Sequence, residues 1–365
     1  MSNNMDVYAE RLTAVRQKLA QWDVDAVLIT GPANRRWLSG FTGTNGQLLI
    51  TPERAWLATD FRYYERARQE APLFELFKHR RIRQDGRRFF KQAGVKRIGI
   101  EANDVTLAQG KELRGLRTGI KWVPLEKTVE PLRAVKTAVE IQKLQAAAAI
   151  TDRAMAQVNR LARPGLTEKE LAWALEKQMR EDGADGMAFP VIVASGPNSA
   201  LPHHQTSSRR LQAGDVIIVD MGAELNGYKS DMTRSFYLGN EPTKKFWEIY
   251  NLALAAHTAV FDQLRPGMTL RQIDSIARDL ITAAGQEEYF GHGLGHGVGL
   301  DIHEAPFLSQ RAPEEARIQA GMTVTIEPGI YIPGWGGIRI EDFAWVTKNG
   351  LERISHCPKT AVISE

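Results

Sequence analysis

A short motif occurs twice in the second part of this chain. Arg-Pro-Gly-Leu-Thr at 163–167 recurs as Arg-Pro-Gly-Met-Thr at 265–269, 102 positions later. In each copy Pro and Gly end one helix, and the threonine starts the next through a capping box with Glu170 or Gln272 three residues on. Such a repeat predicts a domain built from two related halves, with an active site between them.

The length of the chain and its change of pattern predict two domains. At 365 residues it exceeds what one hydrophobic core usually organises. Residues 6–130 alternate helical and strand-like segments, as in a small α/β domain. Residues 137–161 are alanine-rich and contain no glycine or proline, so one long helix is expected to open the second domain. We place the domains at 1–132 and 133–365.

The composition excludes several classes of protein. With 43% hydrophobic and 25% charged residues, the chain is not collagen-like, coiled-coil or wholly disordered. It has no apolar run long enough for a membrane span and no N-terminal stretch that resembles a signal peptide. The single cysteine, Cys357, cannot form an internal disulfide. We therefore expect a cytoplasmic protein that does not bind membranes.

One basic cluster, at 78–88, is the feature that suggests nucleic-acid binding, because Lys and Arg neutralise phosphates. The cluster has no interleaved aromatic residues, and charge runs of this kind are usually solvated faces. Nucleic acid is therefore not an expected partner.

A predicted hairpin brings two aspartates together. The Asn-Gly pair at 226–227 favours a two-residue turn, because both residues tolerate positive φ. In that hairpin Asp231 faces Gly222, and Asp220 lies one diagonal step away on the same face. Asp220 also ends the apolar run 216–219, and an isolated buried carboxylate is costly without a cation or donors nearby. The hairpin favours a metal site over a pair of surface aspartates.

Two further strand-like segments carry acidic residues. Glu327 follows the apolar run 322–326 and precedes a Pro-Gly turn. In the strand-like segment 338–344, alternation puts Arg339 and Glu341 on one face. Taken alone, that pair is better explained as a surface salt bridge.

Five of the eight histidines fall in two short stretches. They are His203, His204, His292, His296 and His303. Glycines flank His292 and His296, and they would let the backbone approach a ligand closely. A phosphate-binding loop is the alternative interpretation, but neither G-x-G-x-x-G nor a terminal Gly-Lys-Ser/Thr is present.

Four carboxylates with one histidine suit two divalent cations better than a cysteine-rich structural zinc site. Two cations roughly 3.5–4 Å apart can activate a water for amide hydrolysis. Histidines outside the ligand set would supply protons and hold the oxyanion. We expect manganese, with cobalt, zinc or iron as alternatives.

These motifs resemble those of the pita-bread metallopeptidases, specifically the two-domain Xaa-Pro peptidases, aminopeptidase P and prolidase. The resemblance covers essentially the whole chain, because 37–43 and 59–63 resemble segments of the family's N-terminal domain. It implies an α/β N-terminal domain and an α+β pita-bread catalytic domain with pseudo-twofold halves. The N-terminal domain argues against a methionine aminopeptidase, which normally has the catalytic fold alone.

The resemblance also implies a role for each candidate residue. The implied metal ligands are Asp220, Asp231, His296, Glu327 and Glu341. Asp231 and Glu341 would bridge both metals, and Glu327 would also shuttle a proton. The implied catalytic residues are His203, His292, His303, Glu327 and Arg339. The histidines would contact substrate and Arg339 would orient a ligand carboxylate, whereas His204 looks incidental.

The expected function is removal of the N-terminal residue from peptides with proline in the second position, by a homodimer. Proline there presents a tertiary amide with no N–H, so the site must accept its ring. An Xaa-Pro dipeptidase acting only on dipeptides is the first alternative. A metal-free creatinase-like hydrolase and a non-enzymatic binding protein of the same fold are disfavoured, because all five ligand positions are intact.

Overall fold

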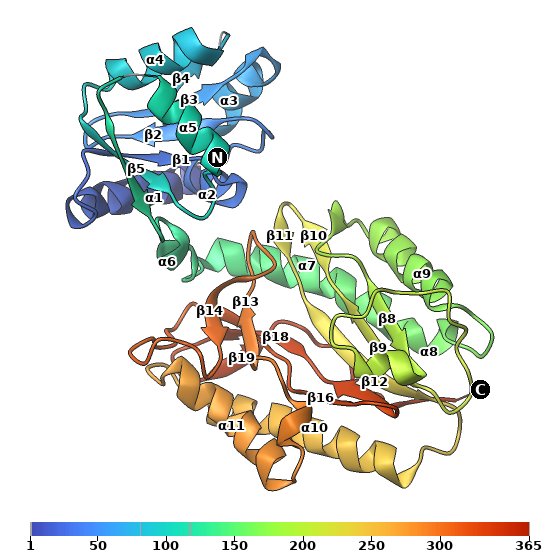
Figure 1. The fold of residues 1–365 in the computed structure, drawn as a ribbon. Helices are drawn as coiled ribbons and strands as arrows, with labels where there is room; N and C mark the ends of the chain where they lie inside the picture. The colour runs from blue at the N-terminus through green and yellow to red at the C-terminus, as the bar shows by residue number, and fades with distance from the viewer. Residues whose placement is uncertain (1, 81, 117, 365) are drawn as a thin grey trace. The chain divides into compact units, whose positions relative to one another are not determined.

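The computed structural model describes residues 2–80, 82–116 and 118–364 (Figure 1). The chain divides into two compact units, Met1–Arg133 and Ala134–Glu365. The boundary predicted from the sequence near residue 132 lies beside this division. Each unit has its own hydrophobic core.

The first unit is a mixed six-stranded sheet with helices. The strand order is β4-β3-β2-β1-β5-β6. The strands are β1 (Ala26–Ile29), β2 (Gln47–Ile50), β3 (Ala55–Thr59), β4 (Glu75–Lys78), β5 (Arg97–Glu101) and β6 (Lys121–Leu125). The helices are α1 (Ser2–Gln21), α2 (Pro32–Ser39), η1 (Phe61–Tyr63), α3 (Tyr64–Glu70), α4 (Ile82–Gln92), α5 (Leu107–Gly115) and α6 (Glu130–Arg133). This is the α/β domain that the alternating sequence pattern predicts.

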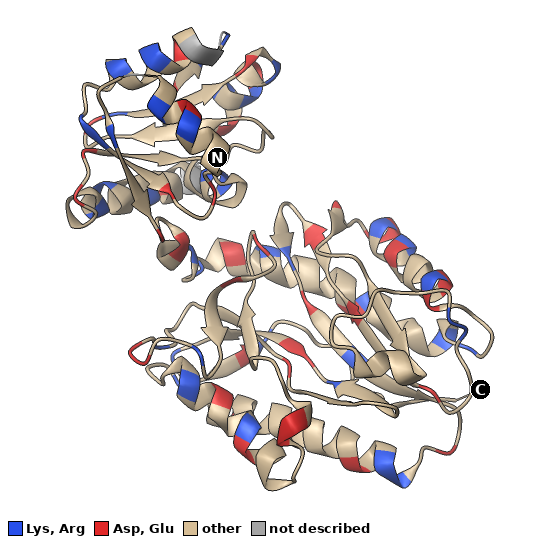
Figure 2. Ribbon diagram, viewed as in Figure 1, with Lys and Arg blue, Asp and Glu red and all other residues tan. Residues whose placement is uncertain are grey.

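The basic cluster at 78–88 belongs to β4, α4 and the segment between them, where Lys and Arg are visible on α4 (Figure 2). Arg81 lies outside the described residues. Arg88 pairs with Asp85 one helical turn earlier at 3.4 Å. Within the described ranges, no helix is both long and apolar enough to cross a membrane.

The second unit consists of two halves, residues 134–240 and 241–365, called here the first and second half. The first half contains α7 (Ala138–Ala156), α8 (Val158–Leu161), α9 (Glu168–Glu181), β7 (Gly186–Met187), β8 (Ile192–Ser195), η2 (Gly196–Ala200), β9 (Val216–Met221), β10 (Ala223–Leu225), β11 (Tyr228–Lys229) and β12 (Met232–Leu238). The second half contains α10 (Lys244–Gln263), α11 (Leu270–Ala283), η3 (Glu287–Tyr289), β13 (Gly295–Gly297), β14 (Glu304–Leu308), β15 (Thr323–Ile326), β16 (Gly329–Ile332), β17 (Gly336–Arg339), β18 (Asp342–Val346), β19 (Leu351–Arg353) and β20 (Val362–Ile363). Within this unit, α7 and α9 lie on one side of the strands and α10 and α11 on the other (Figure 1).

The repeated motif adopts the same structure in both halves. Thr167 and Thr269 are the N-caps of α9 and α11, and both form complete capping boxes. The glycine of each motif has φ near 90°. Its backbone N–H donates to Leu211 O at 2.8 Å in the first half and to Ile318 O at 2.9 Å in the second. The sequence repeat therefore marks a structural repeat, as predicted.

One long helix over 137–161 is wrong in detail, because α7 ends at Ala156 and α8 begins at Val158. At the junction Gln157 N–H donates to Ala154 O and Arg160 N–H to Gln157 O, both at 3.0 Å. These i to i+3 bonds tighten the turn locally and end the regular helix.

The hairpin register is as predicted. Leu225 pairs with Tyr228, and farther along the hairpin Thr233 pairs with Asp220. Asn226 and Gly227 both have positive φ, 50° and 76°, as the tight turn requires.

Candidate active site

All nine residues that the sequence singled out as ligands or catalytic groups line one cavity of the second unit, about 920 Å³ in volume. They are His203, Asp220, Asp231, His292, His296, His303, Glu327, Arg339 and Glu341. Apolar side chains, among them Phe189, Ile192 and Phe307, line the same cavity. A mostly apolar hollow with a few converging polar groups is the usual form of a small-molecule or peptide site.

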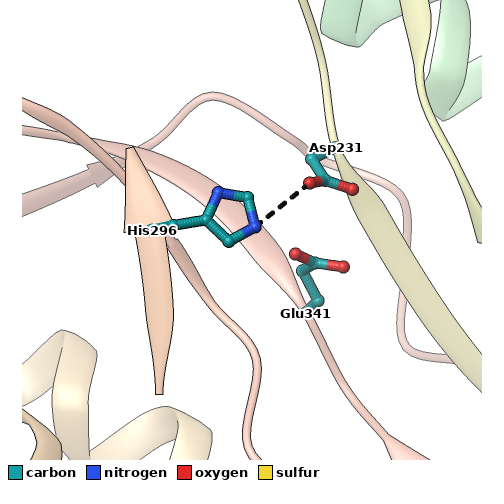
Figure 3. Close-up of side chains that lie close together, drawn as sticks. All are labelled: Asp231, His296 and Glu341. Atoms are coloured by element: carbon teal, nitrogen blue, oxygen red, sulfur yellow. Dashed lines mark ion pairs between the residues drawn. The ribbon is translucent and has the colours of Figure 1, made fainter. Parts of the chain in front are cut away.

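Three of these side chains point toward one another (Figure 3). One ligand atom each from Asp231, His296 and Glu341 lies within 4.8 Å of the others, a spacing at which they could hold a metal ion. The Nε2 atom of His296 is 3.7 Å from Asp231 Oδ2 and 3.4 Å from Glu327 Oε1. The histidine therefore faces acids from both halves.

The acids lie where strands end or break. Asp231 falls between β11 and β12, and Glu341 falls between β17 and β18, where the sequence pattern predicted unbroken strands. Asp220 is the second-last residue of β9, and Glu327 directly follows β15. The side chains of all four acids line the cavity.

The glycines beside His296 allow close packing within the chain itself. A Cβ atom on Gly295 would lie 2.0 Å from Thr325 O, and one on Gly297 would lie 2.3 Å from Ala305 O. The close approach is thus between β13 and its neighbouring chain segments. The glycines let those segments pack tightly around the histidine.

Burial makes it unfavourable for the carboxyl groups of this cluster to be charged. Burial raises the pKa of Asp231 and of Glu341 well above their usual values, and the neighbouring carboxylates raise both further. Burial also raises the pKa of Glu327. Buried carboxylates this close together need cationic compensation to remain charged.

Asp220 supplies an independent sign of a missing partner. Its Oδ2 atom accepts a hydrogen bond from Arg339 Nη2 at 2.7 Å. Its Oδ1 atom is buried and has no hydrogen-bond partner among the described residues. Four carboxylates, one imidazole and an unpaired buried oxygen fit divalent cations of the manganese, cobalt, iron or zinc type.

Arg339 links several site residues and, as predicted, contacts an acid of the set. Besides Asp220, it donates from Nη1 to the Tyr331 hydroxyl at 2.8 Å and from Nε to Thr233 Oγ1 at 3.0 Å. The Thr233 hydroxyl in turn donates to Glu341 Oε2 at 2.6 Å. One guanidinium therefore orients acids of both halves.

Sequence reasoning missed Tyr331. Its hydroxyl is 3.0 Å from His292 Nε2, and burial raises its pKa to about 12, so it stays protonated. Tyr331 pairs with Gly337 across β16 and β17, and a Cβ on Gly337 would lie 2.9 Å from the tyrosine ring. That glycine opposite an aromatic residue is the one local signal that could have drawn attention to it.

The other two histidines are exposed on the cavity wall. The His303 ring lies edge-on to the His296 ring, with centroids 4.4 Å apart. His203 lines the cavity from the loop after η2. Its neighbour His204 contacts Glu168 at 2.9 Å.

Comparison with known families matches both units of the chain. The model of metallopeptidase family M24 matches residues 142–348, and that of the creatinase/prolidase N-terminal domain matches residues 11–135. The chain belongs to metallopeptidase family M24. This confirms the predicted pita-bread fold with its additional N-terminal domain. The M24 family implies divalent metal ions, in agreement with the donor set described above.

Individual relatives match this M24 protein over nearly its full length. An Xaa-Pro dipeptidase of Pyrococcus horikoshii is 37% identical over 96% of this chain and 98% of its own. The structure of an Xaa-Pro dipeptidase from Bacillus anthracis has a TM-score of 0.94, with 39% identity over 97% of this chain and 99% of the other. That of an X-Pro aminopeptidase from Thermotoga maritima has a TM-score of 0.87, with 34% identity over 96% and 100%.

Proposed function

We propose that this M24 protein hydrolyses the peptide bond between an N-terminal residue and a proline in the second position. The observation that carries the proposal is the convergence of four carboxylates and one imidazole from both halves in one cavity. In the proposal, Asp220, Asp231, His296, Glu327 and Glu341 hold two divalent cations, manganese first among them. Asp231 and Glu341 are shared between the two.

Two bound cations would lower the pKa of a water and polarise the scissile carbonyl. The residues of the chain would transfer the proton and hold the ligands in place. Glu327 takes the proton of the attacking water and returns it to the prolyl nitrogen, which must gain a proton to leave. Arg339 holds Asp220 in place through the 2.7 Å hydrogen bond.

The histidines outside the ligand set bind the peptide in this proposal. His292 is held by the Tyr331 hydroxyl at 3.0 Å, which fixes its ring. His203 and His303 approach from the exposed rim of the cavity. Apolar side chains such as Phe189 and Phe307 offer surfaces for the proline ring and the preceding side chain.

Two substrate lengths are compatible with this site. The sequence favours an Xaa-Pro aminopeptidase acting on longer peptides. The names of the Pyrococcus horikoshii and Bacillus anthracis relatives favour dipeptides. We propose an Xaa-Pro dipeptidase first. An Xaa-Pro aminopeptidase is the second candidate, because a cavity of about 920 Å³ exceeds what a dipeptide needs and the Thermotoga maritima relative bears that name.

The test compares a matched series of peptides after reconstitution with Mn²⁺. Ala-Pro, Ala-Pro-Ala and the control Ala-Ala are assayed for released alanine, with and without EDTA. We expect cleavage of Ala-Pro, little cleavage of Ala-Ala, and loss of activity with EDTA. Cleavage of the tripeptide alone would favour the aminopeptidase. Cleavage of neither proline peptide, or activity that survives metal removal, would refute the proposal.

A homodimer and a cytoplasmic location stay predictions from the sequence. Sedimentation of the purified chain would decide the first of these.

A further inference from the structure

The cavity wall that carries His203 contacts a buried carboxylate that has no part in the chemistry proposed above. The segment 195–207 runs from the end of β8 through η2 into a loop. It places His203 and His204 on the cavity. Glu168, the first residue of α9, is completely buried against this segment.

The two oxygens of Glu168 hold opposite ends of the segment. Oε1 accepts hydrogen bonds from Ser195 N and Oγ at 2.8 and 2.7 Å and from Asn198 Nδ2 at 3.0 Å. Oε2 accepts from Ser207 N and Oγ at 2.9 and 2.6 Å and lies 2.9 Å from His204 Nε2. One rigid group thus joins the start of the segment to its end.

These bonds are strong because Glu168 stays charged. Burial alone would raise its pKa, but the hydrogen bonds from Ser207, Asn198, Ser195 and His204 outweigh burial and lower the pKa to about 2. Hydrogen bonds to an ionised acceptor are roughly twice as strong as neutral ones. A loop without its own strand ladder is therefore held firmly.

The same segment also contacts the acid cluster indirectly. The carbonyl of Pro202 accepts from Arg339 Nη1 at 3.3 Å, and Arg339 binds Asp220. The Ser199 hydroxyl accepts from Gly337 N at 2.9 Å, which fixes the segment to β17. His203 lies between Pro202, which Arg339 holds, and His204, which Glu168 holds, so movement of this loop would displace His203.

We propose that Glu168 is a positioning residue that fixes His203 on the cavity wall and so controls peptide binding. The proposal rests on the proposed function, in which His203 contacts the substrate. It makes a chemical prediction about Glu168→Gln. A glutamine has one acceptor oxygen and an NH2 group that can only donate, so it can accept hydrogen bonds from only one end of the segment.

The matched control is Glu170→Gln on the same helix. Glu170 is exposed and serves the capping box of Thr167, a place that Gln272 fills in the second half. Both variants remove one negative charge from the first turn of α9. Only E168Q breaks the connection across the segment 195–207.

The first readout does not depend on activity. Hydrogen exchange and histidine-ring NMR are measured on the full chain of wild type, E168Q and E170Q. We expect exchange at the Ser195 or Ser207 amide to rise at least about tenfold in E168Q, because its acceptor is lost, and the His203 ring signal to shift. E170Q should match wild type. Unchanged exchange and an unchanged His203 signal in E168Q would overturn the positioning proposal. This outcome is separate from activity: if the wild-type chain cleaved no Xaa-Pro peptide, that would refute only the proposed function.

Ser207→Ala is a milder variant in case E168Q does not fold. It removes one donor to Oε2 and leaves the carboxylate in place. It should shift the His203 signal in the same direction by a smaller amount, and a wild-type signal would contradict the proposal.

The second readout is a double-mutant cycle with His203→Ala. E168Q should raise KM for Ala-Pro about tenfold and change kcat by less than about threefold, the pattern of lost binding. In the H203A background, E168Q should add less than about a twofold effect, because both variants remove the same contact. Fully additive losses would show that Glu168 does not act through His203.

Discussion

Each half of the catalytic unit contributes two carboxylates to the cavity from strands or strand ends, yet the two halves do not contribute the same set of proposed metal ligands. The first half contributes Asp220 from β9 and Asp231 just before β12. The second contributes Glu327 just after β15 and Glu341 just before β18. The one imidazole of the proposed ligand set, His296, comes from the second half. The fold repeat thus explains why four carboxylates meet, and the extra histidine makes the proposed metal positions unequal.

A second difference lies in how each half holds its cavity loops. In the first half Glu168 on α9 is surrounded by hydroxyls, amides and His204. In the second half Asp274 on α11 pairs with Arg278 at 2.7 Å and accepts from Leu294 N at 3.0 Å, next to the His292 loop. Each half uses a buried acid on the helix that its repeated motif starts, α9 or α11, but only Asp274 is balanced by an arginine of the same helix.

The largest expected effect comes from removing, in either half, the acid that we propose is shared between the two cations. Asp231→Asn and Glu341→Gln should each lower kcat by more than about a hundredfold, because loss of a residue that only supports a ligand already costs up to about a hundredfold, and these two acids are proposed ligands themselves. The circular dichroism spectrum should remain that of wild type. Kinetics on Ala-Pro with Mn²⁺ measures the loss. A large loss of kcat in one variant and full activity in the other would show that Asp231 and Glu341 do not have equivalent roles in the two halves.

The next largest effect concerns the contact between the halves. Arg234 of β12 is buried and donates to Asp342 Oδ1 of β18 at 2.7 Å. Arg234→Met would remove a buried partner of a buried acid and should lower the free energy of unfolding by about 3–5 kcal/mol. Urea unfolding measures this. A loss below about 1 kcal/mol would mean that the remaining partners of Asp342, among them Lys359, Arg353 and His257, suffice.

The acid that holds the first-half loop should give stability a defined pH dependence. The pKa of Glu168 lies near 2 in the folded chain, below the ordinary glutamate value of 4.5. A lowered pKa means stability that is present above about pH 4.5 and is lost as the pH falls toward 2. The difference in unfolding free energy between wild type and E168Q should shrink by about 3 kcal/mol over that range. A difference that stays constant with pH would contradict this.

The smallest expected effect compares the two repeated caps. Thr167→Ala and Thr269→Ala each remove one side-chain cap and should each lower the free energy of unfolding by about 1 kcal/mol. Thermal unfolding of the two variants would sharpen the comparison. Strongly unequal losses would show that the two motifs, although alike in structure, contribute differently to the free energy of unfolding.

Local patterns in the sequence predict much of this molecule. The Asn-Gly hairpin register and both threonine caps depend on residues a few positions apart, and the structure confirms them. The meeting of the acids in one cavity was predictable from the hairpin and from the family resemblance. Strand breaks at Asp231 and Glu341 were not, because alternation continues through both.

What the sequence could not show depends on the tertiary fold. Tyr331 meets His292 across 39 positions, and Glu168 meets Ser207 across 39 positions. Neither residue lies in a motif, and a tyrosine in a strand or a glutamate at a helix start has an ordinary local explanation. Only the folding of each half brings these side chains to their partners.

The central claim is that the two halves together bind a pair of divalent cations. Equilibrium dialysis of the metal-free chain against Mn²⁺, with metal measured by atomic spectroscopy, tests it directly in wild type, D231N and E341Q. We expect two Mn²⁺ per wild-type chain and one or fewer in each variant. Fewer than two in wild type, or two in both variants, would contradict the claim.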